Sequence, residues 1–507
     1  MAWMMSQFVA MMIAAPILHV RAAGDAGTPQ KIRPAAVAGA FYPADPQALS
    51  QMIDQMLAQA APPPVDGEIL AAVAPHAGYP YSGPVAAWTY AALKGHKYSR
   101  VVVIAPSHYV GFSFTSVYDG DGYSTPLGTV PVDKEFARKL VKMNSSIQLS
   151  DKGHQATPDA PEHSLEVQLP WLQKALGSFE LVPIVMGDQS YESSRALGVA
   201  LAKLLHDDHS TLVLASSDLS HYHTYNEAET IDHKTLNALE AYDYYSMSRN
   251  FQYRGSGQPG IWEACGGAPI VAAMIYAERL GAKKAEVLKY ANSGDVTGDK
   301  SRVVGYSADL FIKTTHAAES APPFSLTDAE KAELLSTARK SVESMIRDRR
   351  QYEPAASASE VLNREYGAFV TLTEGGELRG CIGYTSPVKP LVNTVRDTAI
   401  FAALRDPRFP PVTESELPKL EYEISVLSPL RRVTDVEQIQ VGRDGLIMKN
   451  ADYEGLLLPQ VPVEQHWDRL TFLEQTCRKA GMDRNCWKEE DTDIFRFTAV
   501  VFNEKKL

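Results

Sequence analysis

The stretch VVVIAPSHYVGF, residues 101–112, joins a run of apolar residues to Pro106, Ser107 and His108. A near-continuous apolar run is typical of a parallel strand that is covered on both faces of its sheet. Similar runs occur at AAVAP (71–75), LVPIVMG (181–187) and TLVLASSD (211–218). Helical stretches at 85–93 and 162–176 separate them, and this alternation predicts an α/β fold with a mostly parallel central sheet.

Histidine or aspartate follows several of these predicted strands. His76 comes after 71–75, His108 after 101–106, and Asp218 at the end of 211–218, with His221 three residues later. Ligands of open α/β sheets bind outside the carboxyl ends of the strands. Imidazole is the commonest metal ligand in proteins, and a carboxylate complements it for iron or zinc. We therefore expect these side chains to meet in one crevice.

Two further segments supply residues of the same chemistry. PEHSLEVQLP contains Glu162 and His163, and EACGGAP contains Cys265 followed by two glycines that permit a close backbone approach. A thiolate beside two histidines favours Cu(I), Fe(II) or Zn(II) over magnesium or calcium. Two alternatives stay open, because Asp218 is also suited to cap a helix and Cys265 to fill a small space in the core.

The segment 316–331 is rich in Pro, Ala and Ser and predicts a linker that ends at a helix start. Thr327 and Glu330 have the spacing of a capping box, and apolar residues recur at helical intervals over 334–346. We divide the chain into a leader at 1–28, a first domain at 29–313, a linker at 314–326 and a second domain at 327–507.

The second domain has a different pattern. Residues 367–384 form two β-rich runs around Glu-Gly-Gly-Glu, which is a hairpin signal. A helix at 390–404, strands at 421–428 and 445–450, and a helix at 467–480 follow. This order predicts a smaller α+β domain with a mainly antiparallel sheet.

The N-terminus carries an apolar run, FVAMMIAAPIL (8–18), followed by small residues as at a signal-peptide cleavage site. No Lys or Arg precedes it, so a mis-assigned start codon is the alternative. The run is too short to predict a stable membrane span. The expected location is periplasmic or extracytoplasmic if the leader is real and cytoplasmic otherwise, and Cys477 and Cys486 would be able to form a disulfide in an exported protein.

The formal net charge of −12 excludes a basic nucleic-acid footprint over the whole chain. We expect no nucleic-acid partner. A small molecule or a peptide remains the expected ligand of the crevice.

The first domain resembles the Memo family. The motifs that carry the resemblance occur in order along the chain: AVAGAFYP (36–43), APHAGYPYSG (74–83), APSHYVG (105–111), PEHSLEVQLPWL (161–172), SSDLSHY (216–222) and ACGGAP (264–269). Phe41 departs from the pattern, in which Trp is expected, and we expect this difference to alter packing.

The Memo resemblance implies a fold similar to the class III extradiol dioxygenases of the LigB type. It also implies iron(II) or copper bound by His76, His108 and Cys265, with Asp218 and His221 lining the pocket. The dioxygenases use two histidines and a carboxylate. Because Cys265 takes the place of that carboxylate here, the resemblance implies metal-dependent redox chemistry without implying ring cleavage.

The second domain resembles the AMMECR family, through LRGCIGY (378–384), DPRFPPV (406–412), LEYEISVLSPL (420–430) and LEQTCRKAGM (473–482). The two families are linked with a radical SAM protein in the AmmeMemoRadiSam system, of which this chain would fuse the B-like and A-like proteins. The chain contains no CxxxCxxC motif. The resemblance therefore implies a radical SAM partner that is a separate protein.

Three functions follow as hypotheses. The first is a metal-dependent oxidoreductase in which His163, Asp218 or His221 moves protons. The second is a module that binds a metal or a peptide without turnover. The third is a modification enzyme that uses Cys381, with Arg379 as the cation that lowers the pKa of its thiol; the alternative for this motif is a structural turn with Cys381 packed inside.

Overall fold

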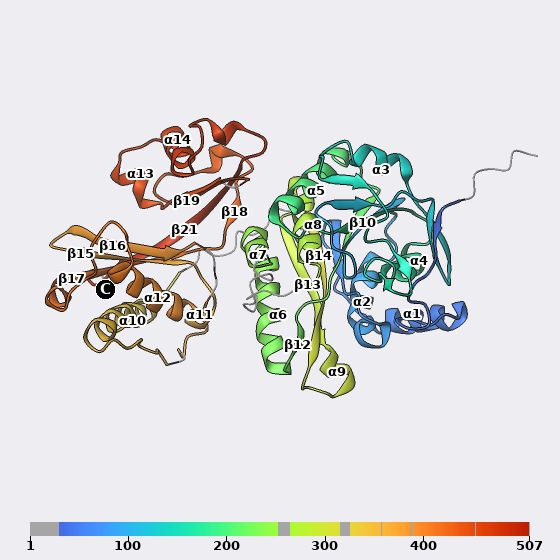
Figure 1. Cartoon of the computed structure of the whole chain (residues 1–507), viewed down its shortest axis with the longest axis horizontal. Helices are drawn as coiled ribbons and strands as arrows, with labels where there is room; N and C mark the ends of the chain where they lie inside the picture. The colour runs from blue at the N-terminus through green and yellow to red at the C-terminus, as the bar shows by residue number, and fades with distance from the viewer. Residues whose placement is uncertain are drawn as a thin grey trace, which may run out of the picture.

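The computed structural model describes residues 30–251, 264–314, 325–355, 357–385, 387, 389–451 and 453–505. Figure 1 shows two lobes, the first built around one large sheet and the second around a curled sheet. The predicted leader and most of the predicted linker lie outside the described residues. No helix within the described ranges combines the length and the apolar character that crossing a membrane requires.

The first lobe contains a nine-stranded sheet in the order β12-β14-β2-β11-β3-β10-β4-β7, with β13 paired to β14. Its strands are β2 (Glu68–Ala74), β3 (Arg100–Pro106), β4 (Thr115–Val117), β7 (Ile147–Leu149), β10 (Glu180–Met186), β11 (Thr211–Ser216), β12 (His221–His223), β13 (Lys284–Asn292) and β14 (Val303–Lys313). A small sheet joins β1 (Ile32–Arg33), β5 (Gly122–Thr125) and β6 (Gly128–Pro131), and β8 (Ala156–Thr157) pairs with β9 (Ala160–Pro161).

The sheet is mixed, and it is parallel in its centre. β2, β11, β3 and β10 run parallel to one another, whereas β14 pairs antiparallel with β2 and β4 pairs antiparallel with β10. The predicted apolar runs correspond to the four central strands. The expectation of a mostly parallel sheet holds for this centre. It is wrong for β12, β13 and β14 and for the pairing of β4 with β10, which are antiparallel, because these outer strands lack the long apolar runs on which the expectation rested; β7 pairs parallel with β4.

Helices cover both faces of this sheet. They are α1 (Pro46–Gln59), α2 (Tyr79–Leu93), α3 (Lys134–Leu140), α4 (Gln168–Leu176), α5 (Tyr191–Leu204), α6 (Tyr225–Glu240), α7 (Tyr244–Phe251), α8 (Gly267–Arg279) and α9 (Ser293–Thr297). Val101 and Val103 belong to the core that includes α1 and α2, whereas Val102 and Ile104 belong to the core that includes α5 and α8. Alternate residues of β3 thus enter opposite cores, which explains why the strand is apolar throughout.

Helix α4 begins at Gln168, later than the predicted start at residue 162. The preceding residues form a turn, because the side chain of Glu162 accepts hydrogen bonds from the backbone N–H groups of His163 and Ser164. A side chain that satisfies local backbone donors in this way competes with the helix.

The second lobe has a seven-stranded sheet in which every pairing is antiparallel, as predicted. Its strands are β15 (Ala368–Glu374), β16 (Glu377–Tyr384), β17 (Leu420–Leu427), β18 (Arg431–Arg432), β19 (Asp444–Asn450), β20 (Tyr453–Leu457) and β21 (Asp493–Asn503). Its helices are α10 (Asp328–Arg347), α11 (Glu360–Asn363), α12 (Leu391–Leu404), α13 (Gln460–Glu464) and α14 (Arg469–Lys479).

Several local predictions for this lobe are confirmed. Thr327 caps α10 in a capping box with Glu330. β15 and β16 form the predicted hairpin, and Gly375 and Gly376 at its tip have φ values of 59° and 89°, which favour glycine. Cys477 and Cys486 form a disulfide in the core beneath α14, which is the bridged alternative for this pair.

The two lobes share a continuous apolar core. Leu427, Ile447 and Phe495 of the second lobe belong to the same buried cluster as α5 and α8 of the first. The ring of Phe495 stacks on Tyr245 of α7, with centroids 4.7 Å apart. Ion pairs surround this contact, among them Arg432 of β18 with Glu278 of α8 at 2.8 Å.

Candidate metal site at the sheet edge

The site lies where three adjacent parallel strands end. β11 lies between β2 and β3 in the sheet. His76, His108 and Asp218 are each the second residue after the end of β2, β3 and β11, respectively. The shared placement that the sequence indicated therefore brings these side chains to one edge of the sheet.

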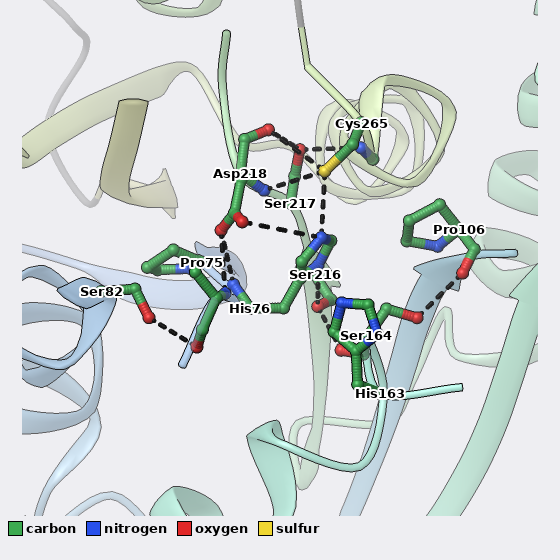
Figure 2. A network of polar contacts seen from close by, with 12 residues as sticks. Pro75, His76, Ser82, Pro106, His163, Ser164, Ser216, Ser217, Asp218 and Cys265 are labelled. Carbon is green, nitrogen blue, oxygen red and sulfur yellow. Dashed lines mark hydrogen bonds and ion pairs between the residues drawn. The ribbon is translucent and has the colours of Figure 1, made fainter. Parts of the chain in front are cut away.

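His76 is the common member of the site. Its Nδ1 lies 2.9 Å from Ser216 Oγ, and its Nε2 lies 3.0 Å from the sulfur of Cys265 (Figure 2). Its ring is buried, and burial, with the charges of His108 and His221, lowers the pKa of His76 well below its ordinary value. The neutral imidazole is the form that ligates a metal.

Cys265 lies two residues before the start of α8 and is held against the residues that follow β11. Its backbone N–H donates to Asp218 O at 3.2 Å, and the N–H of Asp218 points to Cys265 Sγ at 3.3 Å. A Cβ atom at Gly266 would lie 2.2 Å from Ser216 O. The expected close approach at this glycine is therefore real, since any side chain would push Cys265 away from the strand end.

Asp218 is anchored by the backbone of the His76 loop. Its Oδ1 accepts from His76 N–H at 2.7 Å and from Ala77 N–H at 3.2 Å, and its Oδ2 lies 4.0 Å from His76 Nε2. Burial raises the pKa of this carboxyl, against the hydrogen bonds and the nearby histidines. The carboxylate does not cap a helix here, so that alternative for Asp218 is not the one the structure adopts.

Glu162 holds His108 in place. Its carboxylate accepts from the backbone N–H of His108 at 2.7 Å and lies 3.0 Å from His108 Nδ1. Burial works against the charged form, but the hydrogen bonds from His108 outweigh it and lower the pKa of Glu162. The sequence indicated Glu162, together with His163, as a residue able to join the strand-end side chains. It did not predict that Glu162 holds His108, and the shared motif was the available signal for this role.

His163 lies between the other rings. It stacks on His108 with centroids 4.6 Å apart, and Phe41 lies at the same distance on another side. Its Nδ1 is buried and has no hydrogen-bond partner among the described residues, with Glu162 Oε1 at 3.9 Å. Burial and the neighbouring histidines lower the pKa of His163. Phe41, which departs from the Memo motif, therefore packs directly on a residue of the site.

The ligand atoms form two groups of metal-binding size. One contains His76, His108 and His163, and the other contains His76, Asp218 and Cys265; within each group the candidate ligand atoms lie within 4.8 Å of one another. The expected trio of His76, His108 and Cys265 therefore draws on both groups. His221 lies beside them, with its Nδ1 2.9 Å from Leu219 O.

The donor set fits a metal ion. The Nδ1 atoms of His76 and His108 meet Ser216 and Glu162, which leaves their Nε2 atoms for a ligand. Metal-binding histidines commonly use their second nitrogen in this way, because the hydrogen bond fixes the tautomer and the ring orientation. The unpartnered Nδ1 of His163 is a further donor, since a buried polar atom is rarely left without a partner.

Cys381 lies apart from this site, on β16 of the second lobe. Thr371 Oγ1 donates to its sulfur at 3.2 Å, and burial raises the pKa of its thiol. Arg379 forms an ion pair with Glu416 at 2.7 Å. The cation whose charge lowers the pKa of the Cys381 thiol, against the effect of burial, is Arg408. The expected activation of Cys381 by Arg379 is therefore wrong, because the guanidinium is held by a carboxylate and the thiol is desolvated.

Together, the sheet and the cluster at its edge define an α/β protein with a histidine–cysteine site, fused to an antiparallel α+β domain. The Memo-like protein family model matches residues 33–310, and the AMMECR1 family model matches residues 335–502. The chain belongs to the Memo-like family and carries an AMMECR1 domain after it.

The chain is similar in sequence to several known proteins. The MEMO1 family protein MK0963 of Methanopyrus kandleri is 39% identical over 291 residues, which cover 55% of this chain and 98% of that protein. Protein TK0174 of Thermococcus kodakarensis is 46% identical over 182 residues, covering 34% of this chain and 89% of that protein. The crystal structure of the uncharacterized protein PH0010 from Pyrococcus horikoshii is 41% identical, covers 36% of this chain and 95% of that chain, and has a TM-score of 0.35.

Proposed function

We propose that the first lobe is a metal-dependent oxidoreductase whose site takes iron(II) or copper on His76, His108 and Cys265. The observation that supports this proposal is the contact between His76 Nε2 and Cys265 Sγ at 3.0 Å, beside a second imidazole. A set of imidazole and thiolate donors suits these softer ions. The metal would supply Lewis acidity and electrons.

The residues of the chain have separate roles in this proposal. Ser216 and Glu162 orient the two imidazoles through their Nδ1 atoms. Asp218, His163 and His221 lie around the ligands. They are the groups that would hold or move a proton of the substrate. The partly buried rings of Phe41 and His163, which pack on each other, would help to exclude water from one side.

We propose further that the fold of this lobe is related to the LigB-type class III extradiol dioxygenases. The parallel strands that end at His76, His108 and Asp218 support this proposal. The presence of Cys265 beside His76 distinguishes the site from two histidines and a carboxylate, and so ring cleavage is not proposed. The radical SAM partner is proposed on the Memo and AMMECR resemblance alone, and co-purification of an iron–sulfur protein with the full chain would test it.

The test of the function is the absorption spectrum of the metal-loaded protein. Anaerobic loading of wild type with Fe(II) or copper is expected to give a thiolate-to-metal band that Cys265→Ser lacks, since only the thiolate supplies that transition. Cys381→Ser is the matched control and should keep the band. Identical spectra for wild type and Cys265→Ser would overturn Cys265 as a ligand.

A binding module without turnover is the alternative that the same site supports. Substrate-dependent turnover that is lost in Cys265→Ser would exclude it. The modification enzyme based on Cys381 has weaker support, because burial raises the pKa of that thiol.

A further inference from the structure

The turn at residues 189–195, which leads into α5, contacts the candidate metal site on one side. Gln189, two residues before α5, donates from its Nε2 to the carbonyl oxygen of Cys265 at 3.2 Å. Its Oε1 accepts from the backbone N–H of Ala268 at 3.4 Å. One amide side chain therefore holds both ends of the Cys265–Ala268 turn, in which Gly266 already lies tight against Ser216.

The same turn contacts the second lobe on its other side. Asp493, the first residue of β21, is 2% exposed, and its Oδ2 accepts from Tyr191 Oη at 2.7 Å and from Arg195 Nε at 2.6 Å. Its Oδ1 accepts from Arg279 Nη2, at the end of α8, at 3.2 Å. One buried carboxylate of the second lobe thus ties α5 to α8.

These two helices have little room to shift independently. A Cβ atom at Gly198 of α5 would lie 2.7 Å from Ala272 O and 2.9 Å from Ile275 Cβ, both on α8. Closely packed helices move together or not at all, because interiors are packed at crystal-like density. A shift of either helix would therefore also move the turn that carries Cys265.

We infer that the second lobe is a structural part of the site, in which Asp493 and Gln189 are positioning residues for Cys265. Asp493 fixes the first turn of α5 and the end of α8, and Gln189 passes that fixed position to the Cys265 turn. The importance of Cys265 as a ligand rests on the proposed function. The positioning itself is a property of the metal-free chain and can be tested without metal.

The test is the alkylation rate of Cys265 relative to Cys381 in the full chain. Neither of these two cysteines forms a disulfide within the described part of the chain, and both are partly exposed. The purified protein is treated with a chelator, then with iodoacetamide without reductant, and the two cysteine peptides are quantified by mass spectrometry. Asp493→Asn is expected to raise the rate at Cys265 by about threefold or more, while the rate at Cys381 stays unchanged, because local opening increases exposure only at the released segment.

The matched control is Asp444→Asn. Asp444 is an equally buried, arginine-paired carboxylate of the same lobe, and its partners among the described residues, Arg443, Gln440 and Arg496, all belong to that lobe. This variant should leave the Cys265 to Cys381 ratio unchanged. Gln189→Leu should raise the ratio as Asp493→Asn does, because it removes the contact to Cys265 directly.

An unchanged ratio in Asp493→Asn would overturn the inference, and so would an equal rise at both cysteines, which would indicate general loosening. If Asp493→Asn does not fold, Tyr191→Phe takes its place, since it removes only one hydroxyl, and an unchanged ratio there overturns the inference. Failure of metal binding in wild type would contradict the proposed function and leave this ratio unaffected, so the two failures are distinguishable.

Discussion

Cys265 Sγ lies 3.0 Å from His76 Nε2, although the two residues are 189 positions apart in the chain. A different local feature of the fold positions each of these two residues. His76 follows the end of β2, whereas Cys265 precedes α8 and approaches the strand ends because Gly266 has no side chain. His76 belongs to both groups of candidate ligands and so joins them into one site.

Substitution Glu162→Gln is expected to weaken metal binding by about 10- to 100-fold, because loss of a hydrogen-bond partner that orients a ligating histidine has effects of this size. The amide keeps the shape of Glu162 but loses the charge that five groups of His108, His163 and Ser164 now share. Competition with a chromophoric chelator measures the affinity. Glu135→Gln, at an exposed glutamate of α3, is the control; equal affinities for both variants would contradict the role of Glu162.

The loop that carries Glu162 rests on a buried ion pair. Arg33 and Glu166 are 2.6 Å apart with side chains 3% and 0% exposed, and Arg33 also donates to the carbonyl of Glu162. Arg33→Met should lower the free energy of unfolding by about 3–5 kcal/mol, because it leaves a buried charge uncompensated. Urea denaturation measures the change.

Lys31→Met is the control for that variant. Lys31 forms an ion pair with Asp151 at 2.7 Å, but both side chains are about half exposed, and exposed pairs contribute only about 0–1 kcal/mol. Similar losses in the two variants would show that burial does not decide the strength of the Arg33 pair.

The disulfide between Cys477 and Cys486 closes a short loop beneath α14. Replacing both cysteines with serine should lower the stability of the second lobe by about 2–3 kcal/mol, chiefly because the unfolded chain gains freedom. Treating wild type with dithiothreitol should reproduce the loss, and the double variant should not respond to the reagent. A wild type whose urea midpoint is insensitive to dithiothreitol would contradict the bridge.

A buried carboxyl in the first lobe makes stability depend on pH. Burial raises the pKa of Asp309 to about 7, with Ser307 as its hydrogen-bond donor and Glu240 as a nearby like charge. The folded state therefore keeps this proton between about pH 4 and pH 7, where the unfolded state has lost it. Stability should fall with rising pH in that window, by up to about 1.4 kcal/mol per pH unit from this group.

The variant Asp309→Asn isolates this effect. His154 acts in the opposite direction, because burial lowers its pKa to about 3 and the unfolded state then binds the extra proton. Because both proteins contain His154, its contribution cancels in the difference between their free energies of unfolding. This difference should grow in favour of Asp309→Asn from about pH 5 to about pH 8. A difference that is constant over this range would mean that Asp309 is ionised throughout.

The central strands and the strand-end residues could be predicted from the sequence, because a strand buried on both faces has an unbroken apolar run. The edge strands could not, since β13 and β14 mix apolar and polar residues. Asp218 and His76 were recognisable by position after a strand. The motif position of Glu162 indicated that it belongs to the site but not that it holds His108. Gln189 and Asp493 act through contacts between segments far apart in the chain, so local patterns carry no signal for them.

The most direct test of the account is the metal content of the full chain after anaerobic loading with Fe(II) or copper and removal of excess metal. Wild type is expected to retain about one ion per chain, and His76→Ala/His108→Ala is expected to retain almost none, because both imidazole donors are lost. His206→Ala/His209→Ala, at two exposed histidines, should behave as wild type. Equal metal content in wild type and His76→Ala/His108→Ala, whether high or near zero, would contradict a metal site at the ends of β2 and β3.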